Sequence, residues 1–226
     1  MNFSRGIALS FASCLLVIPG SAVLAQVTAH AAVATVPTDI HQIFLDDQSD
    51  RTGDRTVAPY GADVNQRDSI RRAEVRMLLA AGSIKTARDF HDAAYVFQHG
   101  QLADDYLFAH ILAVEAVVKG DSTSKWISAA TLDRYLQAIG QGQVFGTQYS
   151  DKQFVYMQQH KNDPTAATKP ETQEKGMTQE PYDRNLMPDT LRNDFCVPDM
   201  AKQKENLKEF EAGRYPAGII PPGCTR

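Results

Sequence analysis

Residues 86–100, Thr86-Ala-Arg-Asp-Phe-His-Asp-Ala-Ala-Tyr-Val-Phe-Gln-His-Gly100, decide the fold of this chain. The Thr86 hydroxyl and the Asp89 carboxylate, three residues later, have the spacing of a capping box that begins a helix. Four apolar residues then follow at helical spacing: Phe90, Ala93, Ala94 and Phe97. Gly100 can end a helix in the left-handed conformation. We therefore expect an amphipathic helix that starts at Thr86 and ends near Gly100.

Three further helices are expected around this one. A helix over residues 68–81 would bury Ile70, Ala73, Met77 and Leu78. A helix over residues 104–119 would bury Leu107, Ile111, Val114 and Val118. A helix from residue 122 or 124 to residue 139 would bury Ala129, Leu132, Leu136 and Ile139. Short connections make such helices antiparallel neighbours, and small residues favour close packing like that of tetratricopeptide hairpins, although no fixed repeat period is present.

The pattern changes after Gly140. Residues 144–149 and 153–157 are short β-branched or aromatic runs separated by Ser-Asp-Lys, which predicts a hairpin. Residues 160–180 are polar and predict an exposed loop, and residues 181–226 predict a helical tail. In that tail, a helix after Pro198 would turn Met200, Leu207 and Phe210 inward. The predicted fold is mainly α: an antiparallel helical-hairpin bundle with a small β-hairpin and a disulfide-pinned C-terminal tail.

The N-terminus has the features of a secretory signal. Residues 1–25 carry one positive charge, an apolar run and a small-x-small site before Ala25, so cleavage is expected there, with Ala31 as the alternative. A lipoprotein site at Cys14 is a further alternative. Residues 26–42 would be a flexible lead and residues 43–159 the helical core domain. We expect a periplasmic or secreted protein with no integral membrane segment after cleavage.

The net charge narrows the classes of binding partner, and the cysteine count predicts one disulfide. Removing residues 1–25 takes away Arg5 and no acid, so the formal charge changes from −4 to −5. An acidic chain has no broad electrostatic reason to bind nucleic acid or an anionic membrane surface. In an oxidising compartment, Cys196 and Cys224 are expected to form one disulfide.

Three polar residues are candidates for a site. Asp133 lies beside the apolar arc of its helix, so the carboxylate needs a partner or acts as a general acid or base. His99 follows the helix at residues 86–100, where it could bond the last carbonyls or act in catalysis. Arg134 would bind the acids of a neighbouring helix or clamp a carboxylate or phosphate. We expect no metal and no cofactor, because neither His/Cys clusters nor glycine-rich phosphate loops occur. Residues 46–54 lack EF-hand spacing and predict a solvated turn or helix start.

The order Gln98-His99, then Asp133-Arg134, then Gly146-Thr147-Gln148-Tyr149 resembles an uncharacterised bacterial family with Gln-His, Asp-Arg and Phe/Tyr-Gly-Thr-Gln motifs. The resemblance covers roughly residues 45–203. It implies that these residues converge, with Gln98, Arg134, Gln148 and Tyr149 as binding residues, and it implies no particular chemistry. In this chain Gly100-Gln101 follow the Gln-His pair, where common members of the family carry an acid shortly afterwards.

Two classes of function fit these features. The first is a helical binding or scaffold module of the cell envelope with a protein or peptide partner. The alternative is a hydrolase in which His99 is the base, Asp133 orients it, and Arg134 with Gln148 stabilises an anion. An inhibitor or immunity-like role is a third possibility. For the first class we expect His99 or Arg134 to bond the backbone of residues 146–148.

Overall fold

The computed structural model describes residues 39–52, 62–169, 174–217, 219 and 224, all of which belong to one compact unit. The predicted signal and most of the predicted lead therefore lie outside the described residues. The helices and strands follow in chain order: α1 Ile40–Thr52, α2 Ala62–Ala80, α3 Ala87–Phe97, α4 Ala103–Val118, α5 Ser124–Ala138, β1 Ser150–Asp151, α6 Lys152–Gln159, the 3₁₀ helix η1 Ala166–Thr168, β2 Met177–Thr178, α7 Asp189–Asp194 and α8 Met200–Glu211. The fold is mainly helical, as predicted.

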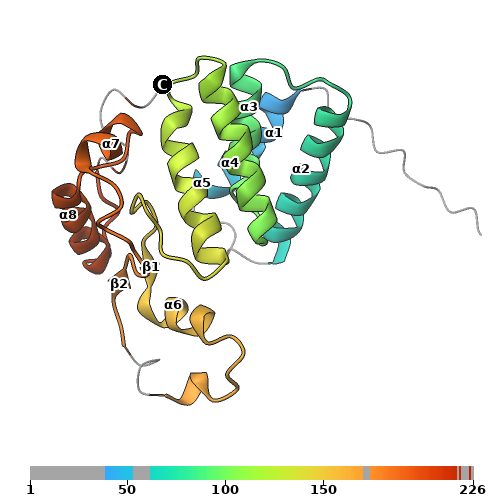
Figure 1. Ribbon diagram of the computed structural model, residues 1–226. Helices are drawn as coiled ribbons and strands as arrows, with labels where there is room; N and C mark the ends of the chain where they lie inside the picture. The colour runs from blue at the N-terminus through green and yellow to red at the C-terminus, as the bar shows by residue number, and fades with distance from the viewer. Residues whose placement is uncertain (1–38, 53–61, 170–173, 218, 220–223, 225–226) are drawn as a thin grey trace, which may run out of the picture. The chain divides into compact units, whose positions relative to one another are not determined.

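The helix predicted around residue 90 is α3, and it begins with the expected capping box. Asp89 N–H donates to the Thr86 hydroxyl at 3.2 Å, and Thr86 N–H donates to the Asp89 carboxylate at 2.9 Å. Three residues of its predicted apolar face are completely buried: Ala93, Ala94 and Phe97. Helix α3 packs against α1, α2, α4 and α5, and Figure 1 shows α3, α4 and α5 side by side. Short connections make these three helices antiparallel, whereas tetratricopeptide-like packing stays a prediction.

Helix α1 begins at Ile40, inside the predicted flexible lead, and it contains part of the acidic run. Ile40 and Ile43 are buried in the same apolar core as Phe97. One turn after Ile43, on the same face of α1, the carboxylate of Asp47 is also buried. The first acids of the run are thus part of a helix that packs against α2 and α3.

Helix α2 buries Leu78 as predicted, but the rest of its buried face differs from the prediction. The inward residues are Asp68, Arg71, Val75 and Leu78. Ile70, predicted to be inside, is 51% exposed. The physical reason is that Arg71 and Asp68 pair with each other and with acids and bases of α1, so burial leaves neither charge unpaired.

Helix α4 is also rotated relative to the prediction. Its buried face consists mainly of small residues: Ala109, Leu112, Ala113 and Ala116. Three of the larger residues predicted inside are exposed, at 53% for Ile111, 41% for Val114 and 74% for Val118. The small face lets α4 approach α3 and α5 closely, which leaves the branched side chains on the outside.

The sheet is two-stranded and antiparallel, but its strands differ from those of the predicted hairpin. Ser150 pairs with Thr178 and Asp151 pairs with Met177. Residues 153–157, predicted to be the second strand, belong instead to helix α6. The Asp151 side chain caps this helix, because it accepts a hydrogen bond from Phe154 N–H. The predicted loop over residues 160–180 contains η1 and the second strand of the sheet.

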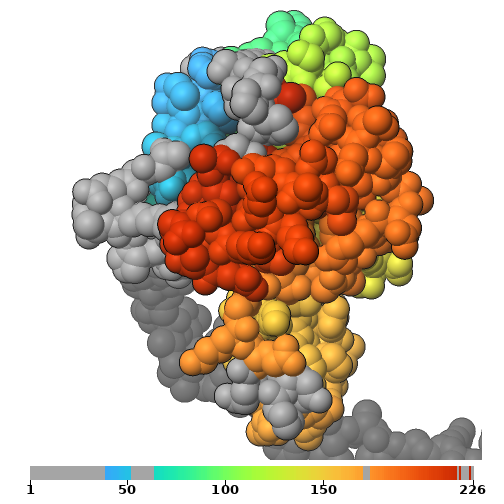
Figure 2. Space-filling view, turned by 90° about the vertical axis from the view of Figure 1, so that its left-hand side faces the viewer, coloured from blue at the N-terminus to red at the C-terminus, as the bar shows by residue number. Residues whose placement is uncertain are grey.

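Residues 174–217 form the C-terminal part, and Figure 2 views the molecule from this side, where its orange-to-red atoms cover most of the face. The predicted disulfide joins Cys196 and Cys224, whose Cα atoms lie 5.7 Å apart. Of the residues predicted inside α8, Met200, Leu207 and Phe210 are half-buried, while the fully buried ones are polar, Gln203 and Asn206. The interior of this part is therefore more polar than the sequence pattern predicted.

Candidate functional site

The Asp133 carboxylate is completely buried and bonds to the backbone of the loop formed by residues 143–149. One oxygen accepts hydrogen bonds from the N–H groups of Val144 at 2.8 Å and Phe145 at 3.0 Å. The other accepts from Thr147 N–H at 2.9 Å and from the Thr147 hydroxyl at 2.7 Å. Burial raises the pKa of this carboxyl, and the hydrogen bonds from the loop act in the opposite direction. Asp133 thus connects α5 to this loop. From the sequence, His99 or Arg134 was expected to bond to the loop backbone, and that prediction was wrong.

Gln148 and Tyr149 have positions of the same kind. The Gln148 amide donates to the carbonyl of Ala130 in α5 at 3.2 Å, and Gln148 N–H donates to the Gln143 side chain at 2.9 Å. The Tyr149 ring packs against Phe210 of α8, with the ring centroids 4.8 Å apart. Burial raises the pKa of Tyr149 to about 12, so its hydroxyl stays protonated. These contacts attach the loop to α5 and α8.

His99 has a different carboxylate partner from the one that the hydrolase interpretation used. Its Nδ1 lies 3.0 Å from Oδ2 of Asp47 in α1, and its carbonyl accepts from the Arg72 guanidinium at 3.1 Å. Burial lowers the pKa of His99 first, the cations Arg51 and Arg134 lower it further, and Asp47 opposes this shift. The imidazole is therefore biased towards its neutral form.

Asp47 belongs to a larger set of paired charges, which we call the charged cluster. Its members are Asp47, Asp50, Arg51, Arg67, Asp68, Arg71 and His99. Arg51 bonds to Asp68 at 2.7 Å, and Arg71 bonds to Asp68 at 3.0 Å and contacts Asp50. Three acids thus face three arginines between α1 and α2, and His99 joins the cluster through Asp47.

Arg134 follows Asp133 directly but has a different environment. Consecutive helical residues point about 100° apart, and Arg134 lies within electrostatic range of His99, Arg51 and Tyr106 instead. Its Nε is buried and without a hydrogen-bond partner, and Arg134 forms no ion pair with any residue that the structure describes. Burial is the main cause that lowers the pKa of this guanidinium.

The predicted site residues therefore divide into two groups. His99 belongs to the charged cluster, Arg134 is coupled to it electrostatically, and Gln98 is buried at the C-terminal end of α3. Asp133, Gln148 and Tyr149 bond or pack around the 143–149 loop. Sequence reasoning missed the roles of Asp47, Asp68 and Arg71. A signal for them existed, because Asp68, Arg71, Val75 and Leu78 share one helical face.

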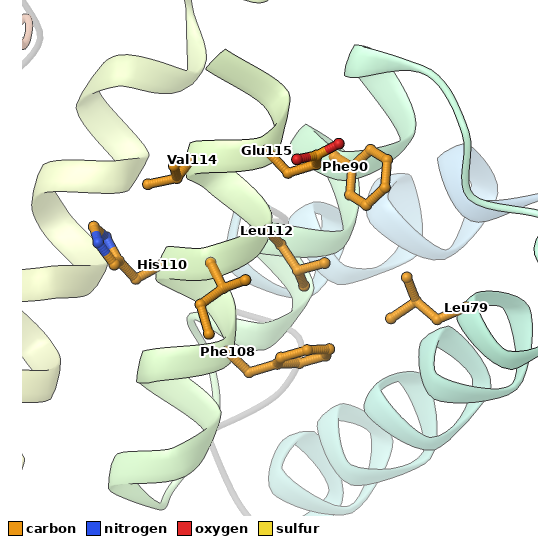
Figure 3. Close-up of a pocket in the computed structure, with 8 residues that line it drawn as sticks. Leu79, Phe90, Phe108, His110, Leu112, Val114 and Glu115 are labelled. Carbon is orange, nitrogen blue, oxygen red and sulfur yellow. The ribbon is translucent and has the colours of Figure 1, made fainter. Parts of the chain in front are cut away.

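A second candidate site is an open apolar groove of about 460 Å³ beside α4. Its lining comes from α2, α3 and α4: Leu79, Phe90, Phe108, His110, Ile111, Leu112, Val114 and Glu115. Figure 3 shows Leu79 and Phe90 facing Leu112 and Phe108 across this groove. The ring of His110 points to the α5 side, where Nδ1 lies 2.9 Å from the Ser128 carbonyl oxygen. The groove continues onto the exposed side chains of Ile111 and Val114.

The described residues contain neither a metal-binding group nor a membrane-spanning helix. No three His, Cys, Asp or Glu side chains in the described part of the chain are placed to hold a metal ion. Among the helices described, none combines the length and apolarity needed to cross a membrane. Comparison with family models, with curated proteins and with solved structures finds no match to this chain. The function must therefore be argued from the residues themselves.

Proposed function

We propose that this chain is an exported helical interaction module of the cell envelope whose binding surface is the outward face of α4. The observation that carries the proposal is the exposure of Ile111, Val114 and Val118 on this helix. With the partly buried Leu107 they are spaced four, three and four residues apart, which is the a/d spacing of a coiled-coil seam. A partner that matches this seam is another α-helix.

The occupant of this surface is a second copy of the chain, with the two α4 helices antiparallel. Asp104 lies in the first turn of α4 and Lys119 at its C-terminal end, and both are exposed. In an antiparallel pair, Ile111 packs against Val114 of the partner subunit, and each Asp104 comes near the partner's Lys119. The charges at the two ends of α4 are thus complementary to those of a second copy.

Sedimentation velocity of the chain without residues 1–25, over a wide range of concentration, tests this assembly. We expect a concentration-dependent dimer, and we expect Ile111→Asp to weaken it by more than about 100-fold, because the substitution enters the seam twice. Ile70→Asp is the matched control, since Ile70 is 51% exposed and Ile111 is 53% exposed. Ile70 lies nine residues before Leu79, so it is on the opposite side of α2 from the groove.

A charge reversal sharpens the test of the antiparallel arrangement. Asp104→Lys should weaken the dimer, and the double variant Asp104→Lys/Lys119→Asp should restore it. A chain that is monomeric at every concentration would overturn the proposal. Equal effects of Ile111→Asp and Ile70→Asp would also overturn it, because self-association would then not involve α4.

A hydrolase is the second candidate, supported by the contact between Asp47 and His99. Asp47 holds Nδ1, so Nε2 is the nitrogen that could take a proton from water, and the lowered pKa of His99 favours the neutral base. Release of p-nitrophenol from its acetate and phosphate esters tests this activity. Turnover that His99→Gln abolishes would support a hydrolase, and equal rates for the two proteins would reject it.

A further inference from the structure

Three polar groups near the charged cluster have hydrogen-bonding capacity that the described residues do not use. They are the Arg134 guanidinium of α5, the Tyr106 hydroxyl of α4 and Nε2 of His99, beyond the end of α3. Electrostatic effects on their pKa values relate Arg134 to Tyr106 and His99 to Arg134. Arg134 is thus coupled electrostatically to groups on two other parts of the fold, the phenol of Tyr106 and the imidazole of His99.

The charge balance around Arg134 differs from that of the other arginines nearby. Arg51, Arg67 and Arg71 each lie within 3.1 Å of at least one aspartate oxygen. Arg134 has no carboxylate partner among the described residues; after burial, its pKa is affected by Tyr106, which raises it, and by a second cation, Arg51, which lowers it. A partly buried cation next to a second cation is unfavourable, and an anion that bonds to it relieves both the desolvation and the repulsion.

We propose that Arg134, His99 and Tyr106 bind the anionic oxygen group, a carboxylate or a phosphate, of a small ligand. The planar guanidinium can donate two parallel hydrogen bonds to such a group. Asp47 fixes Nδ1 of His99, so Nε2 is the nitrogen that can donate to the anion once the ring is protonated. This binding site is separate from the α4 surface, and either can exist without the other.

The site is expected to take up a proton with the anion. The charged groups around His99 are Asp47 and Arg51 from α1, Arg71 and Arg72 from α2, and Arg134 from α5. In the free protein, burial and the cations keep the imidazole neutral. A bound anion offsets the charge of Arg134, which favours protonation of His99. Affinity for the anion should therefore increase as the pH falls.

Isothermal titration calorimetry of the chain without residues 1–25 tests the site with inorganic phosphate and with sodium acetate. We expect saturable binding of one anion per chain, at least about tenfold tighter at low pH than above pH 7, and about 10- to 100-fold weaker in Arg134→Met. Binding of phosphate alone identifies a phosphate ester as the ligand class, and binding of acetate alone identifies a carboxylate. Arg76→Met is the control: it removes a cation that pairs with Asp105 and is 55% exposed.

The variant His99→Gln separates anion binding by Arg134 from the pH dependence that His99 gives to this binding. For acetate, which stays ionised above about pH 6, we expect this variant to bind weakly and with no dependence on pH between about 6 and 8, because Arg134 remains while the titrating group is gone. A pH dependence of acetate binding that persists in His99→Gln over this range would overturn the coupling of anion binding to His99.

Thermal unfolding without added anion gives a readout that a purely structural arginine would not give. Removing an unpaired and partly buried cation should raise the melting temperature of Arg134→Met by about 2–4 °C. A lower melting temperature for Arg134→Met would overturn the proposal, since Arg134 would then stabilise the fold. Absence of binding by both anions, or equal binding by wild type and Arg134→Met, would overturn it as well.

Discussion

The region around α1 and α2 and the region around the 143–149 loop both bury polar side chains, but they satisfy them differently. Between α1 and α2, buried acids and bases bond mainly to each other, as Asp68 does to Arg51 and Arg71. Around the loop, buried polar side chains bond mainly to the main chain. Asp133 accepts from three backbone N–H groups, and the Gln203 amide donates to two backbone carbonyls.

The difference follows from the backbone in each region. A helix satisfies most of its own N–H and C=O groups, so a buried charged side chain beside it bonds mainly to other side chains. The 143–149 loop has no regular structure, and its buried N–H and C=O groups need partners from elsewhere. The side-chain amides of Gln143, Gln179 and Gln203 donate to the loop carbonyls of Gln148, Gly146 and Phe145, in that order. A polar interior can therefore serve either the charges of side chains or an irregular backbone.

The largest expected loss of stability comes from a side chain that bonds to the main chain of the 143–149 loop. Asp133→Ala leaves three backbone N–H groups and the Thr147 hydroxyl without their acceptor, so we expect about 4 kcal/mol lower free energy of unfolding. Urea denaturation measures the loss, with the exposed Asp104→Ala as control. No second substitution should restore it, because the partner is the main chain. A loss no larger than that of the control would contradict this account of the loop.

The disulfide is expected to contribute slightly less. Cys196 and Cys224 close a loop with a sequence separation of 28, and losing that constraint on the unfolded chain costs about 3 kcal/mol. Urea unfolding of the double variant Cys196→Ser/Cys224→Ser should match that of reduced wild type. If reduction leaves the midpoint unchanged, the C-terminal part is stabilised by its hydrogen bonds alone.

In the charged cluster, unlike at Asp133, a second substitution that removes the partner side chain should recover part of the lost stability. Asp68→Leu alone leaves Arg71 buried without one acid and should cost about 3 kcal/mol. Asp68→Leu/Arg71→Met should cost about 2 kcal/mol less than the sum of the single variants, since the pair is removed together. A double-mutant cycle by urea denaturation measures this coupling. Additive effects would show that Asp68 and Arg71 do not act as a pair.

The smallest expected effect is a pH dependence of the same cluster. The hydrogen bond from Arg67 is the largest influence on Asp50, and Arg71 adds to it, so the pKa of Asp50 falls to about 2, well below the usual value for an aspartate. Because the folded-state pKa is the lower one, this stabilisation is complete above about pH 4 and is lost as the pH falls towards 2. Allowing for solvent screening, we expect about 1–2 kcal/mol.

Urea denaturation of wild type and Asp50→Asn at a series of acidic pH values measures this contribution. The difference in stability between the two proteins should shrink as the pH falls from about 4 to about 2. A difference that stays constant over this range would mean that ionisation of Asp50 does not stabilise the fold.

Local signals predicted some of these features well. The capping box of Thr86 and Asp89 depends only on residues three apart, and the structure forms it as predicted. The number of cysteines was enough to predict the disulfide, since only Cys196 and Cys224 follow residue 25. Neither inference required knowledge of distant contacts.

Features that depend on distant partners were harder to predict. The sequence alone favoured branched residues for the buried face of α4, but the structure buries its alanines, because close approach to α3 and α5 rewards small side chains. The second strand was expected immediately after the first, whereas the pairing strand is at residues 177–178. For Asp133, the sequence showed a carboxylate near the core in need of a partner, but the partner lies 11 to 14 residues away in an irregular loop.

The sequence by itself determined the helical class, the first turn of α3 and the cysteine pair, because these depend on local spacing and on composition. The tertiary structure decided which helix faces are buried and which acid meets His99. Asp47 is 52 residues from His99, and no pattern in the chain selects it over Asp133. Only the packing of α1 against α3 brings that carboxylate to the imidazole. Burial then makes the pairing necessary, because a charge withdrawn from water must find its partner within the fold.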